Sequence, residues 1–142
     1  MTKSRRFVLV LAASFVVFAA AILGGCAPSN DFEVVDAVRS DLQLEGFGRI
    51  ESEVHYGQSG AVEEGGPAVE LLVTSRESSR SILEGRLGDM GFADAGIDSW
   101  RRESPYTLVQ FGDRSGGTKY TPPGGPSVIV PSGGGLVVVI SS

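Results

Sequence analysis

The apolar residues that follow position 30 recur every three or four residues, a spacing typical of a helix with one buried face. They are Phe32, Val35, Val38 and Leu42. Asn30 and Glu33 have the spacing of a capping box at the start of a helix. Gly46 is suited to the left-handed position at a helix end, with Phe47 as its hydrophobic contact. The pattern predicts a first helix between Asn30 and Gly46.

A second stretch of helical period follows the same plan. Thr74 and Glu77 form another capping box, and Gly91 followed by Phe92 repeats the glycine ending. The apolar stripe between them consists of Ile82, Leu83, Leu87 and Met90. The recurrence predicts a second helix and suggests an internal duplication of the chain.

Strand patterns follow each predicted helix. Ile50, Ser52, Val54 and Tyr56 alternate with charged residues, which predicts a half-buried strand. Ala68–Val73 and Leu136–Ile140 are apolar runs typical of buried strands, and Trp100–Glu103 with Tyr106–Phe111 predicts a strand interrupted by a bulge at Pro105. The order αββαββ predicts an α+β fold, a two-layer sandwich in which a four-stranded antiparallel sheet carries two helices on one face.

The composition changes between Gly112 and Gly135, where glycine and proline are too dense for a helix or a central strand. This predicts a Gly/Pro-rich loop over 112–135 inside the folded domain. One short apolar segment, Val128–Val130, lies within the loop. We expect this segment either to belong to an unstructured connector or to pair with an edge strand or a partner.

The first 25 residues have the charge and hydropathy pattern of a secretory leader. Lys3, Arg5 and Arg6 are the only charged residues before position 31, and Phe7–Leu23 is apolar apart from Ser14. Such a basic segment stays on the cytoplasmic side while the apolar segment enters the bilayer. The pattern predicts a hydrophobic signal helix within 1–25, a short tether over 26–30 and one domain over 31–142.

The leader ends in Leu23-Gly24-Gly25-Cys26, an aliphatic residue and two small residues before the only cysteine of the chain. This ending resembles the lipobox of bacterial lipoprotein precursors, and the resemblance covers about the first 26 residues. It implies that Cys26 receives a diacylglyceryl thioether, that cleavage follows Gly25, and that Cys26 becomes an N-terminus acylated with fatty acids such as palmitate. The implied location is the extracytoplasmic face of the cell membrane.

Two alternatives to lipidation remain open. Phe7–Leu23 is just long enough to span a bilayer as an uncleaved anchor. Otherwise the leader is cleaved as an ordinary secretory signal, and Cys26 has no role in anchoring. All three interpretations place the rest of the chain outside the cytoplasm.

The charge of the chain narrows the choice of partners. The 12 basic and 17 acidic residues give a net charge of −5. Removal of 1–25 removes three basic residues and no acidic residue, which leaves 9 basic against 17 acidic residues and a net charge of −8. Because phosphate neutralisation supplies most of the affinity for nucleic acids, this balance argues against nucleic acid. The expected partners are the membrane, through lipid on Cys26, and an envelope protein or glycan.

The inventory of reactive residues favours a binding protein over an enzyme. One cysteine and one histidine exclude a disulfide framework and a zinc site built from these two residue types, and no motif indicates another metal or a cofactor. The alternative is a small hydrolase in which His55 is the general base and Glu51 or Glu53 orients it. No catalytic residue is assigned.

Trp100, Arg101 and Arg102 form the one aromatic–basic cluster, and Tyr106 lies near it in the sequence. An arginine beside an aromatic ring can bind an acidic or glycan ligand, so these three residues are the candidate ligand contacts. The alternative is that Trp100 belongs to the core and the arginines pair with nearby acids. The sequence thus predicts a non-enzymatic lipoprotein that binds an envelope component or takes part in envelope assembly.

Overall fold

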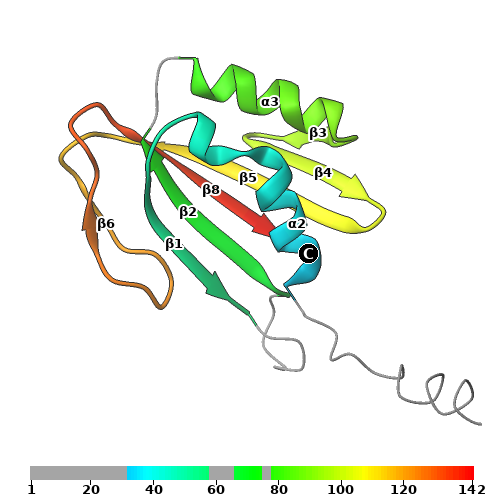
Figure 1. The fold of residues 1–142 in the computed structure, drawn as a ribbon, viewed down its shortest axis with the longest axis horizontal. Helices are drawn as coiled ribbons and strands as arrows, with labels where there is room; N and C mark the ends of the chain where they lie inside the picture. Colours follow the sequence, from blue (N-terminus) through cyan, green and yellow to red (C-terminus); the bar gives the residue numbers. More distant parts are fainter. Residues whose placement is uncertain (1–31, 58–65, 75–77) are drawn as a thin grey trace, which may run out of the picture. The chain divides into compact units, whose positions relative to one another are not determined.

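A computed structural model of the protein describes residues 32–57, 66–74 and 78–142. It contains helices α2 (Glu33–Leu42) and α3 (Ser79–Asp89) and a 3₁₀ turn, η1 (Leu44–Gly46). The strands are β1 (Ile50–Tyr56), β2 (Ala68–Thr74), β3 (Ala93–Gly96), β4 (Ser99–Glu103), β5 (Tyr106–Arg114), β6 (Lys119–Tyr120), β7 (Val128–Ile129) and β8 (Gly135–Ser141) (Figure 1). The predicted leader, Cys26 and the tether lie outside the described residues.

Six strands form one antiparallel sheet in the order β1-β2-β8-β5-β4-β3, and β6 and β7 form a separate hairpin. Strand β8 pairs with β2 on one side and with β5 on the other, so it joins two blocks of strands that are far apart in the sequence. The fold is α+β, as expected. The expected sheet of four strands is wrong, because the sheet has six.

The sheet has two strands more than predicted, for two different reasons. Ser104 and Pro105 lie in the turn of a hairpin between β4 and β5, so the single strand with a bulge at Pro105 is wrong. Within this turn the hydroxyl of Thr107 donates to the carbonyl of Pro105 (3.1 Å). Strand β3 was missed because its four residues, Ala-Asp-Ala-Gly, are all exposed and carry no apolar alternation.

Both helices pack against the same face of the sheet, as expected (Figure 1). Alternate residues of the three central strands point toward them: Val69, Leu71 and Val73, then Val109 and Phe111, then Leu136, Val138 and Ile140. The helices contribute Val35, Val38, Leu42, Leu83 and Leu87 to the same buried cluster. Each such side chain contributes about 1.5–3 kcal/mol when fully buried, so this layer is the main core.

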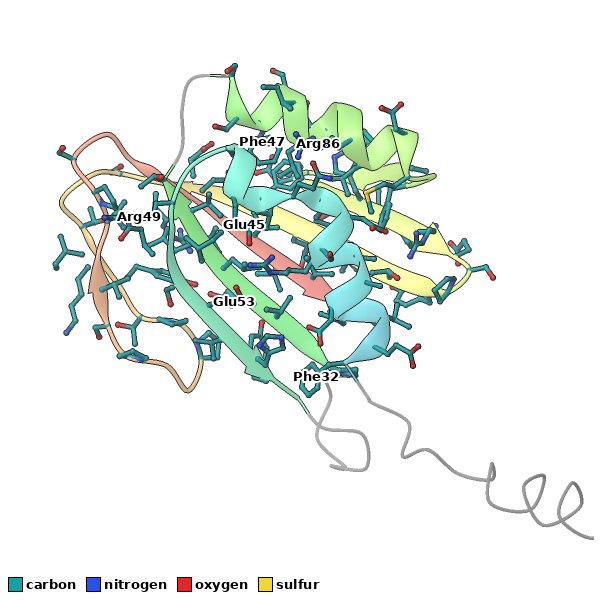
Figure 2. All side chains as sticks on the ribbon, viewed as in Figure 1. Phe32, Glu45, Phe47, Arg49, Glu53 and Arg86 are labelled. Atoms are coloured by element: carbon teal, nitrogen blue, oxygen red, sulfur yellow. The ribbon has the colours of Figure 1, made fainter. Side chains whose placement is uncertain are left out.

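The first helix ends earlier than predicted. It stops at Leu42, and Gln43 takes the left-handed backbone conformation (φ 48°) that was expected of Gly46. Gly46 closes the 3₁₀ turn instead, and Phe47 behind it is buried in the core. Arg86 of α3 donates to the carbonyl of Leu42 (2.6 Å) and stacks on the ring of Phe47 (4.6 Å; Figure 2). The second helix therefore supplies the C-terminal cap of the first.

The second helix begins at Ser79 with Ser78 as its N-cap, four residues after the predicted N-cap, Thr74. Thr74 is the last residue of β2, and its hydroxyl accepts a hydrogen bond from the amide of Arg49 (2.7 Å). The predicted ending at Gly91 is confirmed. Gly91 is left-handed (φ 81°), and the amide of Phe92 donates to the carbonyl of Leu87 (2.9 Å), as in a Schellman motif.

The stripe predicted for the second helix is only partly correct. Leu83 and Leu87 lie one turn apart and are buried, whereas Ile82 is rotated by about 100° from Leu83 and is 47% exposed.

The two halves of the predicted duplication differ in their order of elements. Helix α2 is followed by two strands, whereas α3 is followed by three strands, the β6–β7 hairpin and β8. The order αββαββ is therefore wrong, and the fold gives no support to a duplication.

The segment predicted as a loop over 112–135 is largely structured. Strand β5 continues to Arg114, and β6 pairs with β7. The second face of the sheet carries a separate buried cluster of Leu72, Tyr120, Val130 and Val137. Glycine permits the close packing of this cluster, because a Cβ at Gly135 would overlap the side chain of Leu72. The interpretation of Val128–Val130 as an unstructured connector is wrong, since Val128 and Ile129 pair with β6 and Val130 packs on the sheet. The segment does not pair with an edge of the six-stranded sheet, and binding of a partner stays a prediction.

Strand β1 is confirmed, but its residues do not all share one face. The register shifts between Ile50, which pairs with Val73, and Ser52, which pairs with Leu72. Ile50 therefore faces the helices, whereas Val54 and the residues at alternate positions along β1 lie on the second face.

We expect Leu71→Ala to lower the free energy of unfolding by about 2–5 kcal/mol, because Leu71 is fully buried at the centre of the sheet. Urea denaturation followed by circular dichroism measures the change. Ile82→Ala is the matched control, since Ile82 is 47% exposed and should cost less than about 1 kcal/mol. Equal losses in the two variants would contradict this arrangement of the core.

Candidate binding groove

The second face of the sheet, opposite the helices, contains a row of residues aligned by strand pairing. Tyr56 pairs with Ala68, Ala68 with Ser141, and Ser141 with Leu108. Ala68 and Ser141 are small, whereas Tyr56 and Leu108 on either side are large. The row therefore forms a hollow that crosses β2 and β8 between walls on β1 and β5.

This hollow is an open groove with a volume of about 440 Å³. Its floor includes Ala68, Val139 and Ser141, and its sides include Tyr56 of β1 and the row Tyr106, Leu108 and Gln110 of β5. Tyr106 is 52% exposed. Among the residues that the structure describes, no side chain that lines the groove carries a charge.

The β6–β7 hairpin covers the sheet at one end of the groove. Tyr120 and Val130 pack against Leu72, which lies two residues beyond Glu70 along β2. The turn of the hairpin reaches β1, where a Cβ at Gly125 would overlap the side chain of Val54. The groove is therefore the part of the second face that the hairpin leaves open.

A buried carboxylate links this hairpin to the groove. Glu70 is only 8% exposed, and it accepts hydrogen bonds from the hydroxyl of Tyr120 at Oε1 and from the hydroxyl of Tyr56 at Oε2 (3.2 Å). Burial, reinforced by the charge of Glu70, raises the pKa of Tyr56 to about 12 and also raises the pKa of Tyr120. The network orients Tyr56 in the groove wall and holds the hairpin on the sheet.

His55 lies on the other face of β1, beside helix α2. Its Nε2 is 2.8 Å from Oδ1 of Asp36, and the ring of Phe32 packs edge-on against it at 5.3 Å. The side chains of His55 and Asp36 are 39% and 46% exposed, and neither residue lines the groove. His55 is thus a surface residue at the contact between α2 and the edge of the sheet.

The carboxylates that were expected to orient His55 are bound elsewhere. Glu51 pairs with Arg49 (2.7 Å), and Glu53 pairs with Arg39 (2.9 Å), which also pairs with Glu45 (Figure 2). The predicted hydrolase arrangement, in which Glu51 or Glu53 orients His55, is therefore wrong. The acid beside His55 is Asp36. Of these ion pairs, Arg39–Glu53 ties α2 to β1.

The predicted aromatic–basic cluster is divided between the two faces of the sheet. Trp100 pairs with Val109 and packs against the main core, and Arg102 lies over the ring of Phe92 at 4.8 Å. Arg101 points to the second face, where it pairs across strands with Leu108 of the groove and forms an ion pair with Glu103 (2.8 Å). Of the three residues, only Arg101 lies beside the groove.

The predicted lipidation site, Leu23, Gly24, Gly25 and Cys26, lies outside the described residues. Within 32–57, 66–74 and 78–142, no helix has the length and apolar composition needed to cross a bilayer. Over the same ranges, no cluster of three or more His, Cys, Asp or Glu side chains is arranged to hold a metal ion.

Comparisons of the chain with protein-family models, with curated proteins and with solved structures found no match.

Sequence reasoning missed the groove, although part of its signal was present. Alternation along the predicted strands already placed Tyr106, Leu108 and Gln110 on one face. The missing information was strand order, because only the pairing of β8 with both β2 and β5 brings Ser141 between Ala68 and Leu108.

We expect Tyr120→Phe to cost about 1–3 kcal/mol of stability at pH 7, because Glu70 loses a buried hydrogen-bond donor.

The raised pKa values of Tyr56 and Tyr120 mean that the folded protein keeps protons that the unfolded chain releases above pH 10. Stability should therefore fall as the pH rises from about 10 to 12, and less steeply in Tyr56→Phe and Tyr120→Phe. Urea denaturation at a series of pH values tests this, with the exposed Tyr106→Phe as the control that should resemble the wild type.

Proposed function

We propose that the protein is a lipoprotein held at the extracytoplasmic face of the cell membrane by acyl chains on Cys26, and that its domain binds an envelope component. The observation that carries the proposal is the sequence Leu23-Gly24-Gly25-Cys26 directly after a basic and apolar leader. Cys26 is the only cysteine of the chain, so its position at this boundary has a simple explanation if it is the lipidated residue.

The length of the tether supports a position close to the membrane. Five residues lie between Cys26 and Phe32, and the extended chain from one to the other spans at most about 20 Å. Phe32 contacts His55, which precedes Tyr56 of the groove. The chain thus enters the domain at the end of β1 that borders the groove, and a lipid on Cys26 would keep the groove near the membrane surface.

The groove supports binding as the activity of the domain. It is open, and its side chains offer an aromatic ring, hydroxyls and an amide without a charged group. General acid–base catalysis needs an ionisable group within reach of the bound substrate, and the His55–Asp36 pair lies on the opposite face of the sheet. Binding is therefore the function that this geometry favours.

We expect Cys26→Ser to release the protein from the membrane fraction or to leave an unprocessed precursor. Mass spectrometry of the native protein should find a diacylglyceryl or triacyl group on Cys26 at the mature N-terminus, because several acyl chains are needed for stable anchoring. Ser29→Ala, three residues beyond the cysteine, is the control and should behave as the wild type. An unmodified thiol on a protein that stays in the membrane would overturn lipidation.

A further inference from the structure

We infer that the groove on the second face of the sheet binds a neutral saccharide chain. The chemistry of the inference comes from the groove itself, whereas its location near the membrane rests on the proposed function.

The groove cannot bind a peptide by adding a strand to the sheet. Its floor lies on β2 and β8, which are both paired on each side. The backbone donors and acceptors of these strands are therefore used within the sheet, and a peptide that adds to a sheet needs an unpaired edge. A ligand on this face must be recognised through side chains.

The charge of the groove argues against ionic ligands. No lining side chain is a cation that could bind a phosphate or carboxylate, and Arg101 at the rim is already paired with Glu103. The nearest buried carboxylate, Glu70, is occupied by the hydroxyls of Tyr56 and Tyr120, so it does not provide a cation site. The ligand that fits is uncharged.

The polar groups of the groove argue against a purely apolar ligand such as an acyl chain. Gln110 and Ser141 line an open groove, and the amide of Gln110 already donates to the hydroxyl of Ser99 (3.4 Å). Burial of the Gln110 amide oxygen and the Ser141 hydroxyl under hydrocarbon would carry a desolvation cost without a compensating hydrogen bond. A ligand with its own hydroxyl groups avoids this cost, because it can hydrogen-bond both side chains.

The shape of the groove suits the flat, amphipathic rings of a sugar chain. Three strand spacings separate Tyr56 from Leu108, about 14 Å, and the small residues Ala68 and Ser141 lie between them. Tyr106 stands at the side with an exposed aromatic ring, on which the apolar face of a sugar can stack. Tyr56 is fixed in the opposite wall by its hydrogen bond to Glu70.

Saccharide binding by the full-length lipidated protein in detergent micelles can be measured by calorimetry. The probes are three neutral tetrasaccharides that differ in linkage and N-acetylation: chitotetraose, cellotetraose and maltotetraose. We expect at least one to bind with a dissociation constant below about 1 mM. Because the groove lacks charged side chains, the affinity should not change between low and high salt.

Substitutions at two positions of the groove test the site. Tyr106→Ala removes the exposed ring and should weaken binding at least about tenfold, whereas Tyr106→Phe keeps the ring and should retain most of the affinity. Ser141→Phe places a large side chain in the hollow without touching the main core and should abolish binding. The control is Ile97→Ala, at a side chain that is 94% exposed and outside the groove, which should bind normally.

The outcomes separate this inference from the proposed function. Failure of all three neutral tetrasaccharides to bind, or binding that is unaffected in both Tyr106→Ala and Ser141→Phe, overturns the saccharide site. Stronger binding of an acidic oligogalacturonide or of an uncharged peptide also overturns it. Each of these results leaves lipidation of Cys26 untouched, because that is read from the mass of the N-terminus.

Discussion

The central strands are apolar on both faces, and the rest of the structure depends on shielding both faces from water. On one face the two helices cover Val69, Leu71 and Val138 and form the main core. On the other face, Tyr120 and Val130 at the β6–β7 hairpin cover Leu72 and Val137. The hairpin is too short to cover the whole face, and the uncovered remainder is the groove. An open apolar surface on a sheet favours association with other molecules. Ser141, Gln110 and two tyrosines lie among the apolar residues of the groove and lower this tendency.

Glu70 is the exception to the apolar pattern of β2, and it explains how the second face is organised. A buried carboxylate requires hydrogen-bond donors, because its desolvation is otherwise costly. Tyr120 supplies one from the hairpin and Tyr56 supplies the other from the groove wall. Placement of the hairpin and orientation of Tyr56 are therefore coupled through one side chain.

Local patterns predicted the elements whose apolar residues are periodic, and failed where tertiary contacts decide. Strands β2 and β8 and the glycine ending at Gly91 were found because their signals are local. The end of α2 was misplaced because its C-terminal carbonyl is capped by Arg86, which is 44 residues away. The segment from 112 to 135 was taken for a loop because its glycines serve close turns, as Gly116 does beside Ser132. The groove required the order of the strands, which alternation along one strand does not contain.

The position of β8 has a consequence for the order in which the sheet assembles. Although β8 is the last of the described elements along the chain, it occupies the middle of the sheet between β2 and β5. The hairpin of β1 and β2 and the meander of β3, β4 and β5 therefore remain separate until residues 135–141 are available to join them. A chain made from its N-terminus therefore cannot complete this sheet until residues 135–141 have been synthesised, so β2 and β5 stay without their common neighbour while the segments between them are made.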